Sequence, residues 1–194
     1  IQIFKGFNIF GINLNFCIEN NKMALIKTLK GKTPKTGQNC FLAETATLIG
    51  EVEMGDNCSV WFNAVIRGDV HSIKIGNNTN IQDNAVVHAT YQKSPTTIGN
   101  NVTVAHGAII HGCTIEDNVM IGMNAVILDD AVVHKNSIIA AGSVVTKGTI
   151  VEPGSVYAGI PAKKIKNTGK DLIEGEIERI ASAYGMYAGW YKNG

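Results

Sequence analysis

The sequence predicts an all-β chain that is built as a parallel β-helix and followed by one C-terminal α-helix. Three observations lead to this prediction: aliphatic residues recur every six positions, similar four-residue strings repeat along the chain, and the last residues follow a helical apolar pattern. The 194 residues include 21 glycines. Together with many Asn, Asp, Val and Ile residues, these glycines indicate short strands joined by tight turns. A chain of this length favours one domain with a sizeable core.

The six-residue period differs from both the helical repeat and the alternation of a hairpin strand. It is typical of a parallel β-helix, in which three hexads form one coil and successive coils stack about 4.8 Å apart. The repeated aliphatic positions are Leu48, Met54, Val60, Ile66, Ile75, Ile81, Val87, Ile98, Val104, Ile110, Ile115, Ile121, Ile127, Val133, Ile139, Val145 and Val151.

Two insertions interrupt this period. The segment GDVHS lengthens the step from Ile66 to Ile75, and the segment TYQKSPT lengthens the step from Val87 to Ile98. Ser-Pro in the second segment is a loop signal. We expect both insertions to protrude as loops from corners of the solenoid, where functional residues often gather.

The chain divides into three parts. Residues 1–22 are apolar but interrupted by Asn and Gly, so they match neither a signal peptide nor a membrane span, and we interpret them as a non-native or upstream-translated extension. Residues 23–165 form the predicted β-helix domain. Residues 166–194 contain apolar residues three and four positions apart, which predicts a C-terminal α-helix packed along the coils or on a neighbouring chain.

Charge and cysteine content exclude several classes of partner. The net charge is +1, from 17 basic and 16 acidic residues, so nothing points to nucleic acid or an anionic membrane surface. The four cysteines are widely spaced without a CxxC motif, which argues against a zinc knuckle and against a disulfide framework. We therefore expect a cytoplasmic protein with no nucleic-acid or membrane partner.

Two histidines fall into one column of the predicted coils. His88 ends AVVH and His111 ends AIIH, strings that align with ATLI, AVIR, AVIL and SVVT on other coils. Strand alternation turns both rings outward, one above the other, as two ligands of one tetrahedral zinc would require. His106 belongs to the adjacent face, above Asp83, so a third ligand would most simply come from a neighbouring subunit. Three histidines plus water is the open pattern of catalytic zinc.

A simpler interpretation of these histidines stays open. Outward histidines on a solenoid also serve as ordinary polar residues of a surface or an interface, but two in one column with a third nearby favour a metal site. His134 lies in a second AVVH string that the frame places on another face, so we expect it to be polar surface. His71, in the first insertion, fits either interpretation. Cys113 is expected to be a small buried core residue.

The motifs in combination resemble the γ-class carbonic anhydrase family, which belongs to the hexapeptide-repeat superfamily. The resemblance covers roughly residues 33–166, and it implies that the β-helix is left-handed. It also implies reversible hydration of CO2 to bicarbonate by metal-bound hydroxide, with Zn2+ as the metal and Fe2+ or Co2+ also suited to three imidazoles. The motifs are RGD at 67–69, NIQD at 80–83, VVHA at 86–89, VAHG at 104–107, IHGC at 110–113, IGMNA at 121–125 and YAGIPAK at 157–163.

The resemblance also implies a set of site residues and a homotrimer. The metal ligands would be His88 and His111 of one chain and His106 of the next. Arg67 and Asp83 would form an ion pair across the same interface, with Asp69 close by, although a purely structural corner ion pair is equally open for Arg67 and Asp69. Three further residues would line the site or bind bicarbonate: Asn80, Gln82 and Tyr157. Asn and Gln also stack as plain turn ladders in such folds, which is the alternative for Asn80 and Gln82.

The chain departs from the family pattern where protons would leave the site. Val70 and Tyr91 stand where the best-characterised γ-class pattern has glutamates, so His71 or bulk buffer would have to take the proton. Two rival functions also stay open. One is a hexapeptide-repeat acyltransferase that uses acyl-coenzyme A and His134 as base. The other is a metal-binding family member without hydration activity, thioesterase-like or non-catalytic.

Overall fold

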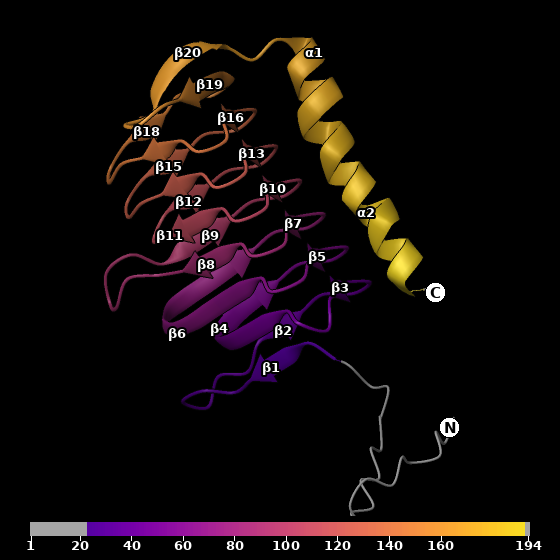
Figure 1. Ribbon diagram of the computed structural model, residues 1–194. Helices are drawn as coiled ribbons and strands as arrows, with labels where there is room; N and C mark the ends of the chain where they lie inside the picture. The colour runs from indigo at the N-terminus through magenta and orange to yellow at the C-terminus, as the bar shows by residue number, and fades with distance from the viewer. Residues whose placement is uncertain (1–22, 193–194) are drawn as a thin grey trace, which may run out of the picture.

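The computed structural model describes residues 23–192. They form a left-handed parallel β-solenoid with three faces, and a helical segment lies along one face (Figure 1). Strands of successive coils pair in parallel along each face, so the predicted fold class is confirmed.

Two of the three faces belong to one continuous sheet. The long strands β4 (Thr47–Met54) and β6 (Val65–Ile75) bend from the first face to the second and join them. The first face also contains β1 (Leu25–Lys27), β8 (Val86–His88), β11 (Ile109–His111), β14 (Val126–Ile127) and β17 (Val144–Val145). The second face also contains β2 (Lys35–Thr36), β9 (Thr96–Ile98), β12 (Thr114–Ile115), β15 (Val132–Val133) and β18 (Ile150–Val151).

The third face is a separate sheet. It contains β3 (Phe41–Leu42), β5 (Ser59–Val60), β7 (Asn80–Ile81), β10 (Thr103–Val104), β13 (Met120–Ile121), β16 (Ile138–Ile139), β19 (Ser155–Ala158) and β20 (Lys163–Asn167). All of its pairs are parallel except the last, where β20 turns back against β19. This antiparallel strand occupies the stretch where the sequence prediction placed the end of the solenoid and the start of the helix.

The predicted aliphatic positions fill the interior. Every one of them is buried, and the column Leu48, Ile66, Val87, Ile110, Ile127 and Val145 is completely inaccessible to solvent. Burying such a side chain fully stabilises the folded chain by about 1.5–3 kcal/mol. The hexad therefore specifies the core, and the core in turn fixes the register of the coils.

Asparagines make the corners of the coils. Asn39, Asn57, Asn101 and Asn118 all have a positive φ near 55°, a left-handed conformation that Asn tolerates better than most residues. Their amides also stack between coils, since Asn39 donates to Asn57 over 2.9 Å and Asn101 to Asn118 over 3.1 Å. The high Asn content thus has a conformational cause.

The two insertions behave differently. The TYQKSPT segment leaves the solenoid as a loop between β8 and β9 (Figure 1), closed by a bridge between Thr90 and Ser94. The expectation of a loop is wrong for GDVHS, because these residues stay inside β6 as a bulge: the pairing shifts there from Gly50–Gly68 to Val52–Ile73. The extra residues keep an extended backbone and remain within the strand.

The C-terminal helical segment covers the third face and runs back toward the first coils (Figure 1). It consists of α1 (Lys170–Leu172), the π-helical η1 (Ile173–Glu178) and α2 (Arg179–Lys192). Aromatic rings fix α2 in place: Tyr184 meets Trp61 edge-on at 5.2 Å, and Tyr191 meets Phe41 at 5.6 Å. Within residues 23–192, none of the helices has the length and apolar character needed to span a bilayer. Residues 1–22, interpreted above as an extension, lie outside the described residues.

We expect Ile121→Ala to lower the free energy of unfolding by about 2–4 kcal/mol, because it leaves a cavity in the close-packed interior of the solenoid. Ile150→Ala is the matched control, since Ile150 is 54% exposed. Urea unfolding followed by circular dichroism measures both values. Similar losses for the two variants would contradict the assignment of the hexad positions to the core.

Candidate metal centre

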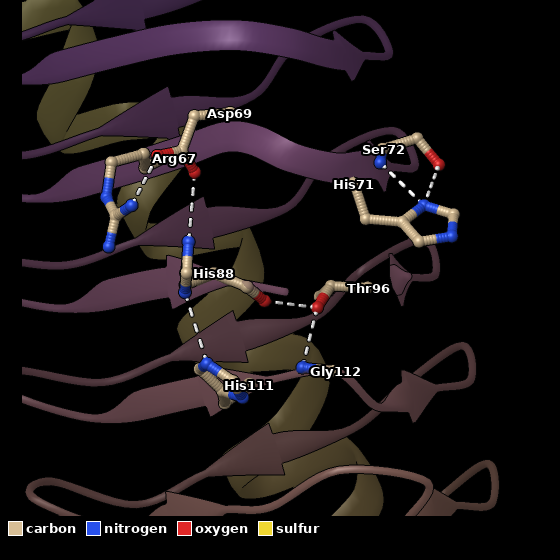
Figure 2. A network of polar contacts seen from close by, with 8 residues as sticks. All are labelled: Arg67, Asp69, His71, Ser72, His88, Thr96, His111 and Gly112. Atoms are coloured by element: carbon tan, nitrogen blue, oxygen red, sulfur yellow. Dashed lines mark hydrogen bonds and ion pairs between the residues drawn. The ribbon is translucent and has the colours of Figure 1, made fainter. Parts of the chain in front are cut away.

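His88 and His111 lie one above the other on the first face. They are register partners in the pairing of β8 with β11, as the sequence predicts. Nδ1 of His88 lies 3.1 Å from Nε2 of His111, and the ring centroids are 5.1 Å apart (Figure 2). The two imidazoles therefore present one nitrogen each to a shared point.

Each ring is held by a carboxylate on its other nitrogen. Nε2 of His88 lies 3.0 Å from Asp69 of the β6 bulge (Figure 2), and Nδ1 of His111 lies 2.6 Å from Asp129, just beyond β14. An ionised carboxylate only accepts hydrogen bonds, so it assigns the proton of a neutral ring to the nitrogen facing it. The nitrogens that face each other then both carry a lone pair.

This arrangement fits a metal ion. Two lone pairs 3.1 Å apart need a proton or a cation between them. Nitrogen ligands of a tetrahedral zinc, each 2.0–2.1 Å from the ion, are about 3.3 Å apart. Carboxylates on the outer nitrogens are also the usual supports of metal-binding histidines. The donor set of His88 and His111 thus matches what zinc requires of two ligands.

The backbone around the pair is shaped to allow these contacts. The Thr96 hydroxyl donates to the carbonyl of His88 and accepts from the N–H of Gly112, over 2.5 and 3.0 Å (Figure 2). Gly112 has a φ of +56°, and a Cβ at this position would collide with the carboxylate of Asp129. Glycine therefore allows Asp129 to approach His111.

Arg67 completes the outer side of the pair. Its guanidinium donates to Asp69 over 2.5 Å. Partial burial would raise the pKa of Asp69, but the hydrogen bonds from Arg67 and His88 outweigh it and lower that pKa. Burial lowers the pKa of His88, and the nearby Arg67 cation acts in the same direction. His88 is thus kept in the neutral form that binds metals.

His106 stands apart from the pair, beyond β10 on the third face. Its Nδ1 lies 2.9 Å from Asp83, its predicted neighbour on the coil before, and its Nε2 lies 3.3 Å from the hydroxyl of Tyr184 on α2. Its backbone N–H donates to the Gln82 side chain over 3.2 Å. Burial, followed by the charge of Asp83, raises the pKa of Tyr184 to about 12, so this hydroxyl keeps its proton.

The buried amides Asn80 and Gln82 are linked to one another. Gln82 donates to Asn80 and Asn80 to Thr103, both over 2.9 Å. Tyr157 lies elsewhere: it follows the inward column of the third face, in register with Ile139, and is buried in the core. Within one chain the structure therefore brings Asn80 and Gln82 to His106 but not Tyr157 to the histidines.

Residues 23–192 of one chain contain no group of three metal-binding side chains. His106 makes its contacts on a different face from the pair, so a three-histidine site would need two chains. The predicted ion pair between Arg67 and Asp83 would likewise need two chains, and it stays a prediction. Within one chain, Arg67 pairs with Asp69, and Asp83 pairs with His106.

Two contact residues were missing from the sequence prediction, Asp129 and Tyr184. Asp129 follows the AVIL string of the histidine column, so the acidic pair after that string was a usable signal. Tyr184 falls within the predicted C-terminal helix, but its neighbour on the solenoid depends on where α2 docks, which the spacing does not give. His134 pairs with Glu116 over 2.9 Å at the second face, away from the other histidines.

We expect Asp69→Asn to destabilise the chain by about 1 kcal/mol near neutral pH, because it removes the charge from the contacts with Arg67 and His88. The pKa of Asp69 is lower in the folded chain than its ordinary value of about 3.9. Its stabilising effect is therefore present above that value and is lost as the pH falls through the folded-state pKa.

Urea unfolding at about pH 7 and about pH 3 tests this expectation, with the exposed Glu44→Gln as the control. The difference between the wild type and Asp69→Asn should shrink at the lower pH. A difference of the same size at both pH values would show that the ionised Asp69 carboxylate does not stabilise the fold.

Comparison with known sequences identifies both the hexapeptide repeat and the protein family. A family model described as bacterial transferase hexapeptide (six repeats) matches residues 112–147. Gamma carbonic anhydrase 2, mitochondrial, of Arabidopsis thaliana is 46% identical over 80% of the chain, and an uncharacterised protein of Dictyostelium discoideum is 38% identical over 82%. The chain spans 56% and 66% of the length of these two relatives.

Comparison with solved structures agrees with the hexapeptide-repeat fold. A putative acetyltransferase of Bacillus cereus has a TM-score of 0.85 and 36% identity, over 88% of this chain and 98% of its own. The chain therefore belongs to the γ-class carbonic anhydrase-like family of hexapeptide-repeat proteins.

Proposed function

We propose that the protein is a metal-dependent carbonic anhydrase that hydrates CO2 reversibly to bicarbonate at a site shared between subunits of a homotrimer. The observation that supports this most directly is the geometry of His88 and His111. Their outer nitrogens are held by carboxylates, and their inner nitrogens face each other across 3.1 Å. The name of the Arabidopsis relative indicates the same activity.

The residues of this chain would have the following roles in the site. His88 and His111 of one subunit and His106 of the next would hold Zn2+, with Fe2+ or Co2+ as alternatives. When bound, such an ion lowers the pKa of water to near neutrality, which provides the nucleophile for CO2. Asp69, Asp129 and Asp83 fix the tautomers of the three rings, as supporting carboxylates do in metal sites.

Gln82 is better suited to positioning His106 than to binding bicarbonate. Its carbonyl oxygen accepts the N–H of His106, and its amide nitrogen donates to Asn80. Both ends of the side chain are thus engaged, and it is buried. We therefore assign Asn80 and Gln82 to the alignment of His106, while Tyr157 serves the interior packing of its own chain.

Protons would leave the site through bulk buffer. At the two positions where the family pattern has glutamates, this chain has Val70, which has no ionisable group, and Tyr91, which has no carboxylate. His71 lies in the β6 bulge, but its Nδ1 accepts the N–H of Ser72, and Figure 2 shows its ring turned away from His88. Hydration should accordingly depend strongly on buffer concentration.

An acyltransferase is the second candidate function. The Bacillus cereus neighbour is described as a putative acetyltransferase, and His134 with Glu116 forms a carboxylate-supported imidazole that is typical of a general base. This pair lies at a different face of the solenoid from the three histidines above. The two functions therefore use different residues and can be tested separately.

The location of the protein is part of the proposal. The widely spaced cysteines favour a reducing environment, and we therefore place the protein in the cytoplasm. The Arabidopsis relative, by its name, is mitochondrial.

His111→Ala should abolish both bound metal and CO2 hydration, because it removes one of two adjacent ligands together with its contact to Asp129. His134→Ala is the matched control and should retain both. Metal analysis and stopped-flow hydration measure the two properties. Metal retained in His111→Ala would overturn the ligand assignment, metal without hydration in the wild type would overturn the activity, and acetyl-coenzyme A turnover lost only in His134→Ala would favour the acyltransferase.

A site shared between chains should be restored by mixing two defective chains. In a random trimer of equal amounts of His88→Ala and His106→Ala, about one quarter of the interfaces contain all three histidines. The control mixture is His88→Ala with His111→Ala, in which no interface has the full set. Cobalt binding after co-refolding should return to about a quarter of wild type in the first mixture only. Equal binding in the two mixtures would contradict the shared site.

A further inference from the structure

Tyr184 on α2 contacts the nitrogen of His106 that a metal would use. Asp83 faces Nδ1 of this ring, so a neutral His106 carries its proton there and has a lone pair on Nε2. The hydroxyl of Tyr184 lies 3.3 Å from that Nε2 and is placed to donate to it. The same chain thus supplies both the ligand and a hydrogen-bond partner for its free nitrogen.

The position of this hydroxyl is set by packing of the aromatic ring. Tyr184 meets Trp61 edge-on at 5.2 Å and Tyr187 at 5.4 Å. Trp61 is itself anchored, because its indole N–H donates to Ser59 over 2.9 Å. Because the ring packs against neighbours on two sides, this packing directs the hydroxyl toward His106. The position of the hydroxyl therefore does not depend on the hydrogen bond itself.

A neutral imidazole nitrogen has one lone pair, and it can serve either a hydroxyl donor or a metal ion. We propose that Tyr184 is a positioning residue that competes with the metal for Nε2 of His106 and so lowers the metal affinity of the shared site. This inference rests on the proposed function, because it takes His106 as a ligand. It adds that α2 controls how easily the site is loaded.

The structure provides room for the displaced hydroxyl. A cavity of about 250 Å³ adjoins Tyr184, between α2 and the third face, and its walls include Trp61, Phe62, Asp83 and Tyr187. A small shift of the hydroxyl toward this space would free Nε2 of His106. Loading would then exchange one hydrogen bond for one metal bond and leave the aromatic packing largely in place.

The experiment is a comparison of metal affinity between Tyr184→Phe and the wild type. Phenylalanine keeps the ring that packs on Trp61 and removes only the hydroxyl. Tyr187→Phe is the matched control, because it removes a hydroxyl from the same helix and, among the described residues, no hydrogen bond joins Tyr187 to His106. Protein stripped with a chelator is titrated with Co2+, followed by the visible absorption of the bound ion, and with Zn2+ in a competing chelator.

We expect Tyr184→Phe to bind Co2+ and Zn2+ about twofold to tenfold more tightly than the wild type, the range that one lost hydrogen bond provides. Tyr187→Phe should bind with wild-type affinity. Unchanged or weaker binding in Tyr184→Phe would overturn the role of the hydroxyl while leaving the metal site intact. Tight, stoichiometric binding in His106→Ala, or no binding in the wild type, would instead overturn the proposed metal site and the inference with it.

Discussion

Parallel strands that pair in register place residues of successive coils directly above one another, and buried aliphatic side chains hold that register. A slip of one residue would turn the hexad residues outward and expose the core. His88 therefore lies above His111 because Val87 lies above Ile110 in the interior. Each contact of the candidate site between coils inherits its precision from this core, although the site residues themselves stabilise the fold little.

The polar ladder on the first face shows what this register makes available. Asp69, His88, His111 and Asp129 come from successive coils and alternate so that each imidazole has one carboxylate neighbour and one imidazole neighbour. Carboxylates at both ends attract the ring protons outward and leave electron pairs at the centre. The arrangement therefore creates a site for a cation between the two rings. A ladder of four histidines would not fix the ring protons on the outer nitrogens in the same way.

The sequence predicts those features that depend on the period and fails where local geometry decides. The core, the column of His88 and His111, and the pairing of His106 with Asp83 follow from counting residues in coils. GDVHS was expected to be a loop, yet its residues remain extended, so Asp69 stays close enough to reach His88. Tyr157 belongs to one of the motifs that resemble the γ-class family, but its strand register, opposite Ile139, turns the side chain inward. Neither outcome can be derived from spacing.

The solenoid itself does not distinguish an anhydrase from an acyltransferase, because both are known on the same coil and the fold does not determine the function. The distinction lies in which face holds supported imidazoles. His134 and Glu116 make one such dyad at the second face. Three others stand elsewhere, His88 and His111 on the first face and His106 beyond β10 on the third, and each has its own carboxylate. A single dyad suits a general base, whereas three carboxylate-supported rings with inward lone pairs suit a metal. The number and arrangement of the supported histidines, more than the fold, therefore favour the anhydrase.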